Sequence, residues 1–414
     1  MSLDKNRIGT EPYKGVRDFY PEDQSVQNYI FKIWRETSVK FGFVEYNASI
    51  LEPTDLYKSK SSEEIVNDQT YTFTDRGDRS VTLRPEMTPT VARMVAAKRR
   101  EMSFPLRWFS IPNLFRYERP QKGRLREHWQ LNCDIFGIDN TGAEVEMILL
   151  AYKIMKGFGA RDGDFIIRIN SREILNEAFK KAGITPLESQ GLMKLLDKKN
   201  KIDDFEKQAQ AILGKPYDLK IEAGEDVKNV IKDLELLGVS NVEFDPELVR
   251  GFDYYTGIVF EVFDTHPENR RSLFGGGRYD NLLSIFGGGS GDQPLGAVGF
   301  GMGDVTIKEF LSLRNLLPVY SSSTQLYICN AGAPILRLME IAEEIRSTGV
   351  NVAIDLTDRK IGDQIKKAVK ENIEFVAVIG EIEIASREAS VKHLSSEKEQ
   401  KVSFEKIGSY IKNF

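Results

Sequence analysis

Residues 107–137 read RWFSIPNLFRYERPQKGRLREHWQLNCDIFG, with an apolar stretch at each end and a charged stretch between them. The residues from Trp108 to Tyr117 and from Gln130 to Phe136 are predicted to form two strands, because apolar and aromatic residues dominate both. Arginines on such a strand–loop–strand frame can hold phosphate oxygens with a fork of donors. A solvated hairpin tip also fits the pattern. The loop carries Arg116, Glu118, Arg119, Lys122, Arg124 and Arg126.

Residues 1–320, which include this segment, are predicted to form an α+β domain, with antiparallel strands and helices packed on one side. After residue 170, Lys, Asp, Glu and Leu recur at helical spacing with few aromatic residues, so we expect a helical insertion over 171–242. The patterns predict helices over 25–42, 89–100 and 141–157 and from near Asp304, and strands over 43–50, within 71–83, and over 165–170 and 254–263.

The last part of the chain follows a different pattern. Pro318 and the run Ser321-Ser322-Ser323-Thr324 are typical of a linker. Strands and helices then alternate, which predicts a small mixed α/β domain over 325–414 with largely parallel strands. The expected strands cover 325–329, 351–355 and 375–379, and the expected helices cover 335–347 and 360–372.

Composition excludes several classes of protein. The 414 residues carry 57 basic and 62 acidic side chains, a net charge of -5, which argues against an unspecific nucleic-acid coat but allows a local basic patch. No apolar run is long enough to span a membrane, and the first residues lack the apolar core of a signal peptide. Cys133 and Cys329 have no metal-ligand spacing, so we expect two buried reduced thiols, no metal motif and a cytoplasmic location.

Three further segments could carry chemistry. In Leu83-Arg84-Pro85-Glu86-Met87-Thr88, the carboxylate could bind an ammonium group, although a surface glutamate is the commoner meaning. The segments Arg250–Tyr255 and Phe274–Asp280 each place an arginine near tyrosines and glycines. Glycine allows a backbone to approach a ligand closely. Each of these two segments alone fits a tight turn with packed tyrosines as well as it fits a ligand pocket.

Together, and in their order along the chain, the four segments resemble the histidyl-tRNA synthetases, which are class II aminoacyl-tRNA synthetases. Phe115 to Pro120 is similar to the core of the second class II motif. Leu248 to Tyr255 and Gly276 to Asp280 are similar to the two histidine-specific motifs. The segment 325–414 resembles the anticodon-binding domain of the family, chiefly at Val352–Lys360. The resemblance implies activation of histidine with ATP and Mg²⁺, transfer to tRNA(His), and a homodimer.

The resemblance also implies roles for individual residues. Arg250 and Arg116 would be catalytic, because two cations flanking the α-phosphate would stabilise the charge that develops there. Histidine would be bound by Glu86, Met87, Thr88, Gln130, Asp134, Tyr254, Tyr255 and Tyr279. Asp134 stands where the family often has glutamate. ATP would be bound by Arg116, Glu118, Arg124, His128 and Arg250, and tRNA by Arg119, Gln121, Arg359 and Lys360.

The sequence departs from the class II pattern at two positions. Thr306 stands where the third motif usually carries an arginine for the ATP γ-phosphate. Another basic residue could replace that arginine, ATP could bind differently, or its binding could be weaker. Ser49 stands where the first motif usually has a proline, and Pro53 follows four residues later.

Rival functions have specific signatures. Regulatory subunits of ATP phosphoribosyltransferase share the synthetase core, and the missing third-motif arginine favours them. They typically lack the anticodon domain and the intact Arg-Gly-x-x-Tyr-Tyr motif, and this chain has both. An RNA-sensing module would need an effector segment, and a synthetase for another amino acid would lack the histidine-specific motifs.

Overall fold

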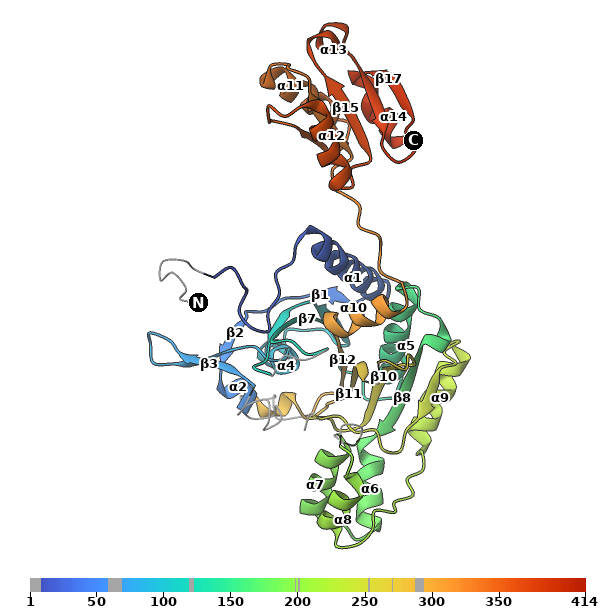
Figure 1. The fold of residues 1–414 in the computed structure, drawn as a ribbon. Helices are drawn as coiled ribbons and strands as arrows, with labels where there is room; N and C mark the ends of the chain where they lie inside the picture. Colours follow the sequence, from blue (N-terminus) through green and yellow to red (C-terminus); the bar gives the residue numbers. More distant parts are fainter. Residues whose placement is uncertain are drawn as a thin grey trace, which may run out of the picture. The chain divides into compact units, whose positions relative to one another are not determined.

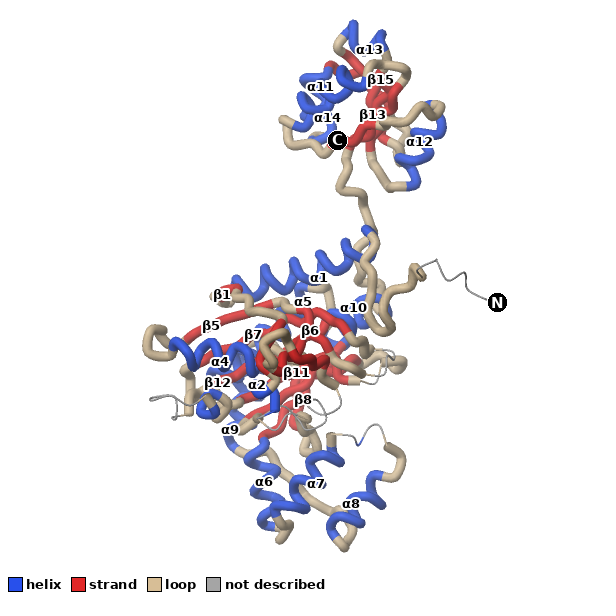
Figure 2. The backbone as a smooth tube through the Cα atoms, turned by 90° about the vertical axis from the view of Figure 1, so that its left-hand side faces the viewer, coloured by secondary structure: helices blue, strands red, loops and turns tan. Residues whose placement is uncertain are grey.

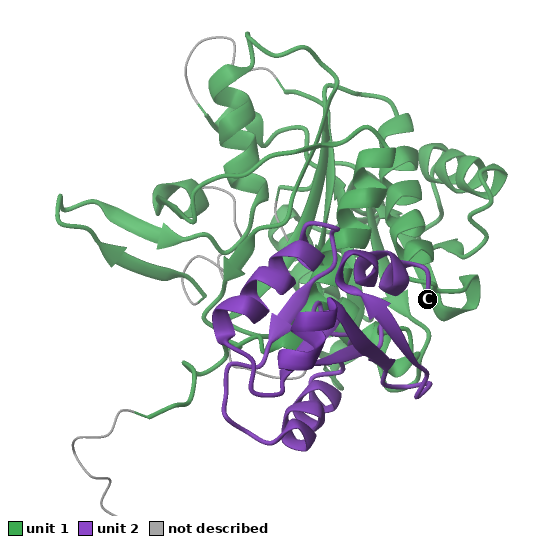
Figure 3. Cartoon of the chain, turned by 90° about the horizontal axis from the view of Figure 1, so that it is seen from above, with its two compact units in different colours: residues 1–317 green, residues 318–414 purple. Residues whose placement is uncertain are grey.

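The computed structural model divides the chain into two compact units, residues 1–317 and 318–414 (Figure 3). We describe each unit by itself. The structure describes residues 9–58, 69–118, 123–197, 199, 202–251, 254–269, 271–286 and 294–414.

The first unit is built on one large sheet, and most neighbouring strands in it run antiparallel (Figure 1). The strand order is β1 (Val44–Glu45), β5 (Leu106–Ser110), β7 (Glu127–Phe136), β12 (Ala297–Gly303), β11 (Ser272–Arg278), β10 (Ile258–Asp264), β8 (Phe165–Ser171) and β9 (Val242–Phe244), and β6 (Asn113–Phe115) pairs with β7. Among the described strands of this sheet, only β1–β5 and β8–β9 pair in parallel. The α+β class predicted from the sequence is confirmed.

Two predicted strands differ from the observed ones. The expected strand 108–117 is interrupted between β5 and β6, where Pro112 has no N–H to donate to the ladder. The expected strand 43–50 is reduced to Val44–Glu45. Beyond it, side-chain oxygens of Asn47 and Ser49 accept backbone N–H bonds and hold a local bend in place of a ladder.

Alternation along the central strands separates two faces of the sheet. On β7, Leu131, Cys133 and Ile135 point into a large core. That core is covered by helices, and Figure 2 shows them lying against the sheet. The intervening residues point to the opposite face, as the period of two along a strand requires. The covering helices are α1 (Pro21–Lys40), α5 (Gly142–Gly157), α9 (Glu225–Leu236) and α10 (Asp304–Leu313).

The opposite face carries a smaller core, formed by α4 (Thr88–Lys98) with buried tyrosines and Leu248. A separate small sheet lies beside α2 (Asp55–Lys58) in the order β2 (Leu51–Pro53), β4 (Ser80–Leu83), β3 (Tyr71–Thr74). Within this sheet, β3 and β4 are the two strands that the sequence predicts within 71–83. Short 3-10 helices cover Asp162–Asp164 and Leu283–Ile285.

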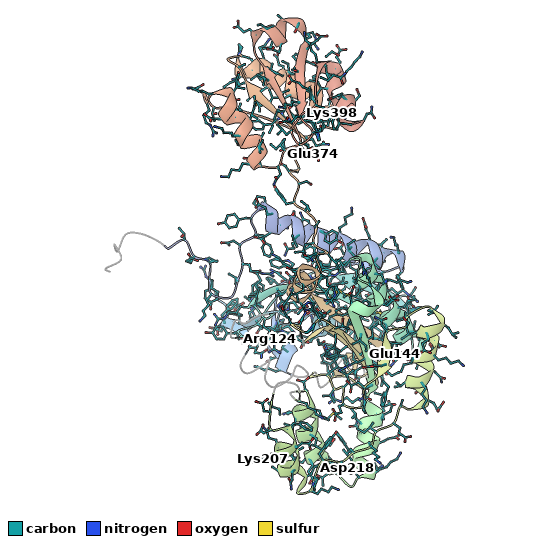
Figure 4. All side chains as sticks on the ribbon, turned by 45° about the vertical axis from the view of Figure 1, so that its right-hand side comes forward. Arg124, Glu144, Lys207, Asp218, Glu374 and Lys398 are labelled. Atoms are coloured by element: carbon teal, nitrogen blue, oxygen red, sulfur yellow. The ribbon has the colours of Figure 1, made fainter. Side chains whose placement is uncertain are left out.

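Between β8 and β9 the chain forms a helical segment with a core of its own. Its helices are α6 (Arg172–Lys181), α7 (Pro186–Leu196) and α8 (Phe205–Leu213). Their buried core includes Leu175, Leu192 and Phe205. Lys207 and Asp218 lie on this segment (Figure 4). The last helix of the range expected for the insertion, α9, instead packs on α5 in the main core.

The second unit comprises residues 318–414, and the structure describes all of them. It is built on a five-stranded sheet with helices packed on it. Its first three strands in sheet order pair in parallel, as the sequence predicts. The two antiparallel strands that extend the sheet were not anticipated from the sequence. The order is β14 (Val352–Ile354), β13 (Leu326–Asn330), β15 (Phe375–Ile379), β16 (Glu388–His393) and β17 (Glu399–Ser403), with α11 (Ile335–Arg346), α12 (Ile361–Lys370), α13 (Glu381–Ser386) and α14 (Phe404–Lys412).

Two further features concern the cysteines and the length and polarity of the helices. Cys133 and Cys329 are both buried free thiols, as predicted. Within the described residues, every helix is too short or too polar to cross a membrane.

A buried ion pair joins the large sheet to the helix layer. Arg278, the last residue of β11, places Nε and Nη2 each 2.6 Å from a carboxylate oxygen of Glu144 on α5. Glu144 is labelled in Figure 4. Both side chains are almost fully buried. Arg278 therefore has a structural task, although it lies inside a segment that resembles a histidine-specific motif.

We predict that Arg278→Met lowers the free energy of unfolding by about 3–5 kcal/mol, because it leaves the Glu144 carboxylate buried without a countercharge. Urea denaturation followed by tryptophan fluorescence would measure the loss. The matched control combines Arg278→Met with Glu144→Leu, and most of the stability should return once both charges are gone. A double variant as unstable as the single one would contradict this account.

Candidate active site

A cavity of about 120 Å³ lies on the face of the large sheet that carries the smaller core. It collects residues from segments far apart in the sequence, including one arginine from the loop after β6 and another from the segment before β10. The lining residues are Glu86, Thr88, Arg116, Gln130, Asn132, Arg250, Tyr254, Tyr255, Gly275, Tyr279, Gly299, Phe300 and Gly301.

Glycines on β12 make room for the polar side chains of β7. Gly299 pairs with Asp134 across the ladder, and a Cβ added to Gly299 would lie 2.2 Å from Asp134 Oδ1. A Cβ added to Gly301 would lie 2.3 Å from Nε2 of Gln130. Real Cβ atoms do not approach other atoms so closely. The alternation AVGFGMG in β12 therefore keeps one face of the strand bare and the other apolar.

A buried acid is bonded to one residue of the cavity lining. Tyr279 donates its hydroxyl hydrogen to Asp134 Oδ1 at 2.5 Å. The other oxygen, Oδ2, is buried and has no hydrogen-bond partner in the described part of the chain. Burial raises the pKa of Asp134 to about 7, against the opposing effect of the hydrogen bond from Tyr279. Such an unsatisfied acceptor costs free energy unless a ligand or water donates to it.

Tyrosines and a glutamate form a second wall. The Tyr254 hydroxyl donates to Glu86 Oε2 at 3.4 Å, and its ring lies 4.9 Å from that of Tyr255. The rings of Tyr254 and Tyr279 meet edge to face at 5.9 Å. Burial raises the pKa of Tyr254 and of Tyr279 well above the ordinary value, so both hydroxyls remain protonated donors.

Arg250 enters the cavity as a buried cation with a fixed partner. Nη1 donates to Oε1 of Glu261 on β10, and Nη2 lies 3.5 Å from the carbonyl oxygen of Gly275. Burial is the largest single influence on Arg250 and lowers its pKa, but Glu261, Tyr255 and Tyr254 together outweigh burial and leave the pKa above its ordinary value. Its Nε is buried without a hydrogen-bond partner among the described residues.

Arg116 brings a second cation to the same cavity. Its Nε donates to the carbonyl oxygen of Pro85 at 2.9 Å, which anchors the guanidinium beside the segment that carries Glu86 and Thr88. The cavity thus holds two guanidinium groups, Glu86 and neutral tyrosine hydroxyls. Such a set can bind a ligand that has an ammonium group and several anionic oxygens.

Some residues singled out from the sequence lie outside the described lining. Met87 and Asp134 are buried, and Asp134 contacts the lining residue Tyr279 through a hydrogen bond. Glu118 and Arg124 pair with each other at 3.2 Å on the loop between β6 and β7, and Figure 4 labels Arg124. Arg119 and Gln121 fall outside the described residues.

His128 lies on β7, where it pairs in register with Leu114 of β6. Burial lowers the pKa of His128 to about 3, and the positive charges of Arg116 and Arg17 add to this effect. The ring is therefore neutral near pH 7.

In the second unit, Arg359 and Lys360 are exposed just before α12. Nε of Arg359 lies 3.1 Å from Oγ1 of Thr357.

Two polar residues of this site were not identified from the sequence. Asn132 lines the cavity, and Glu261 holds Arg250. Each is a polar residue on the cavity face of a strand whose other face is apolar: Leu131 and Cys133 flank the first, and Phe260 and Val262 flank the second. A polar residue between two apolar neighbours of a strand, at a position that shares its face with other polar residues in β7 and stands alone in the middle of β10, was the signal that could have revealed both.

Thr306 makes structural contacts. Its hydroxyl donates to the carbonyl oxygens of Leu273 at 2.7 Å and Gly303 at 3.2 Å. The described residues also contain no cluster of three or more His, Cys, Asp or Glu side chains that could hold a metal ion.

Comparisons with known proteins point to one family. The family model for histidyl-tRNA synthetase matches residues 15–217 and 203–303, and an anticodon-binding domain model matches residues 328–414. The histidine–tRNA ligase of Leptospira biflexa is 41% identical, over 99% of each chain.

Solved structures show the same fold at lower identity. A histidyl-tRNA synthetase from Nostoc sp. PCC 7120 aligns with a TM-score of 0.77 at 21% identity, over 98% of this chain and 99% of that one. A Bacillus halodurans protein described as an ATP phosphoribosyltransferase regulatory subunit/histidyl-tRNA synthetase aligns with a TM-score of 0.70 at 22% identity, over 91% of this chain and all of that one. With a matching family model over most of its length and a relative 41% identical end to end, the chain belongs to the histidyl-tRNA synthetase family.

Proposed function

We propose that this chain forms histidyl-adenylate from histidine and ATP and then transfers the histidine to the 3′ end of tRNA(His). The observation that carries the proposal is the cavity itself. It places two arginines, Arg116 and Arg250, together with an acidic and tyrosine-rich wall formed by Glu86, Tyr254 and Tyr279. Histidine offers an ammonium group, a carboxylate and an imidazole, and ATP adds phosphate oxygens, so the two substrates together match these charges.

The imidazole fits the buried acid. The unsatisfied Oδ2 of Asp134 can accept a hydrogen bond from an imidazole N–H, with Oδ1 held by Tyr279. Binding would relieve the cost of leaving that oxygen without a donor. A site built around one hydrogen bond rejects amino acids that cannot donate it. We assign the selection of histidine to this pair.

The ammonium group of histidine fits the second wall. Glu86 supplies the negative charge. The hydroxyl groups of Thr88 and Tyr254, which line the same cavity, supply further oxygens for hydrogen bonds to the ammonium group. Gln130 also lines the cavity, and its Nε2 donates to Oδ1 of Asn132 at 2.7 Å. We assign these residues to orienting the amino acid, with Met87 and Tyr255 packing around them.

The two arginines then act on the reacting phosphate. A carboxylate oxygen of histidine attacks the α-phosphorus of ATP, and the bond from that phosphorus to the pyrophosphate oxygen breaks. Negative charge grows on the equatorial oxygens in the transition state, where Arg116 and Arg250 can donate to them. The unpaired Nε of Arg250 is one donor available for this task. No side chain needs to move a proton in this step.

The remaining ATP and tRNA contacts are proposals from the family resemblance. Mg²⁺ bound with ATP would neutralise charge on the departing pyrophosphate. Glu118 and Arg124 would act from their loop on the triphosphate, and the neutral ring of His128 would stack on adenine. Arg119 and Gln121 would contact the tRNA acceptor end, and Arg359 and Lys360 its anticodon. In the second step the terminal ribose hydroxyl attacks the acyl carbon and releases AMP.

We also propose a homodimer that works in the cytoplasm. Val39 and Val44, near the end of α1 and on β1, are 60% and 63% exposed. β1 is the last strand at one end of the described part of the large sheet, and a second copy can pair with its outer edge. The two free buried thiols suit a reducing compartment.

Histidine-dependent exchange of pyrophosphate into ATP tests the activity. We expect the purified protein to catalyse this exchange with histidine and not with proline or threonine, because only histidine can donate an imidazole N–H to Asp134. Exchange measured with each amino acid in turn gives the answer. Tight histidine binding with no exchange would favour a regulatory protein instead.

We predict that Arg250→Gln slows the exchange at saturating substrates by about 100-fold or more, because one cation facing the transition state is lost. The change also leaves the Glu261 carboxylate buried beside a neutral group. The control is therefore Arg250→Gln with Glu261→Gln, which should recover thermal stability and remain equally slow. A near-normal rate in either variant would contradict the role given to Arg250.

We predict that Asp134→Asn raises the KM for histidine by about 100-fold or more, because an amide N–H would face the imidazole N–H. The same change should stabilise the unliganded protein at high pH. The raised pKa of Asp134, about 7, means that folding keeps a proton that the unfolded chain releases, so wild-type stability falls as pH rises from about 4 to 7.

The variant lacks this titration. The melting temperature of the variant minus that of the wild type should therefore increase between about pH 5 and about pH 8, measured by differential scanning fluorimetry. A gap that stays constant over this range would show that Asp134 does not titrate as argued.

A further inference from the structure

The segment that carries Arg250 lies between two separate hydrophobic cores. Leu248 belongs to the core on the cavity face of the large sheet, with Tyr254, Tyr255 and Tyr279. The next residue, Val249, belongs to the core of the helical insertion. Both side chains are less than a tenth exposed. One peptide bond therefore connects the two cores, and the following residue is the buried cation of the cavity.

The large sheet holds this segment through hydrogen bonds to its backbone. Asn170, a fully buried residue near the end of β8, donates from Nδ2 to the carbonyl oxygens of Leu248 at 3.0 Å and Pro246 at 3.2 Å. The N–H of Asp245 donates to the carbonyl oxygen of Ile169 at 3.0 Å. The path of the backbone up to Leu248 is thus set by the large sheet.

The insertion holds the same segment by side chains. Val249 packs in the insertion core with Leu195 and Leu196 of α7. Lys199 forms a 2.6 Å ion pair with Glu247, and its ammonium group lies 4.5 Å from the centre of the Phe205 ring.

At the end of α7 the insertion also approaches the backbone of the segment. A Cβ added to Gly251 would lie 3.3 Å from Oδ2 of Asp197. Asp197 also acts on Glu261, the partner of Arg250. Burial is the main cause of the raised pKa of Glu261, and the negative charge of Asp197 raises it further.

We propose that Val249 is a positioning residue, through which the helical insertion sets the place of Arg250 in the cavity. The inference rests on the role of Arg250 proposed above. In the described part of the chain, the ion-pair partner of Arg250 is Glu261 on the sheet, and that contact fixes the end of the side chain. The start of the side chain is fixed by its own backbone, whose last anchor before Arg250 is Val249. A shift of about 1 Å in a group that acts on a transition state can cost about 100-fold in rate.

A passive role for Val249 would have a different consequence. If Val249 only fills space, removing its methyl groups would destabilise the insertion and leave the cavity unchanged. If Val249 positions Arg250, the same change would slow the step in which Arg250 acts, and the binding of histidine, which uses other residues, would hardly change.

The test is the variant Val249→Ala, assayed by pyrophosphate exchange with the full chain. We expect kcat to fall by about 10- to 100-fold and KM for histidine to change by less than about 3-fold. The matched control is Val230→Ala, the same truncation in the main core, where Val230 of α9 is fully buried. It should lower the melting temperature and leave kcat within about 2-fold of the wild type.

A double-mutant cycle with Arg250→Gln completes the test. In that background Val249→Ala should change kcat by less than about 2-fold, because the group it positions is gone. An equal loss of rate in both backgrounds, or a loss as large for Val230→Ala as for Val249→Ala, would overturn the inference. A near-normal rate for Arg250→Gln itself would instead overturn the proposed role of Arg250, so the two failures can be told apart.

Discussion

The bare face of β12 is the constraint on which the site depends. Gly299 and Gly301 lie opposite Asp134 and Asn132, and any side chain at either glycine would occupy the space now taken by Asp134 and Gln130. On the other face of the same strand, Val298, Phe300 and Met302 pack into the main core. One strand therefore holds the helix layer in place and leaves room for the cavity. The period of two along a strand makes both tasks possible at once.

The charges around this cavity are arranged before any substrate binds. Arg250 is paired with Glu261, and Asp134 is held by Tyr279. A buried charge without a partner would be expensive, so these pairs allow the fold to tolerate charge in its interior. Within the residues that the structure describes, each pair still leaves one atom without a hydrogen-bond partner: Nε of the arginine and Oδ2 of the aspartate. The folded protein carries this cost, and a substrate that supplies both missing partners gains from it.

Several features were accessible from the sequence, and others were not. The α+β class, most helices of the first unit and the parallel strands of the second followed from local periodicity. The last two strands, β16 and β17, were missed, because mixed polar segments at a sheet edge lack a strong pattern. The segment 43–50 was predicted as one strand, but side chains of Asn47 and Ser49 bond to the backbone and bend it. Motif residues such as Arg116, Tyr254 and Tyr279 do share one cavity.

The sequence by itself determined which residues could carry the chemistry, because the order and composition of the motifs identify them without knowledge of their contacts. Only the tertiary structure decided what each does. Arg250 and Arg278 stand in similar motifs, yet the first enters the cavity beside Glu261 and the second is bound by Glu144 in the helix layer. Their partners lie on distant strands and helices, and sequence spacing does not specify which distant carboxylate meets which guanidinium. The same holds for Val249, whose neighbours belong to the insertion while those of Leu248 belong to the catalytic core.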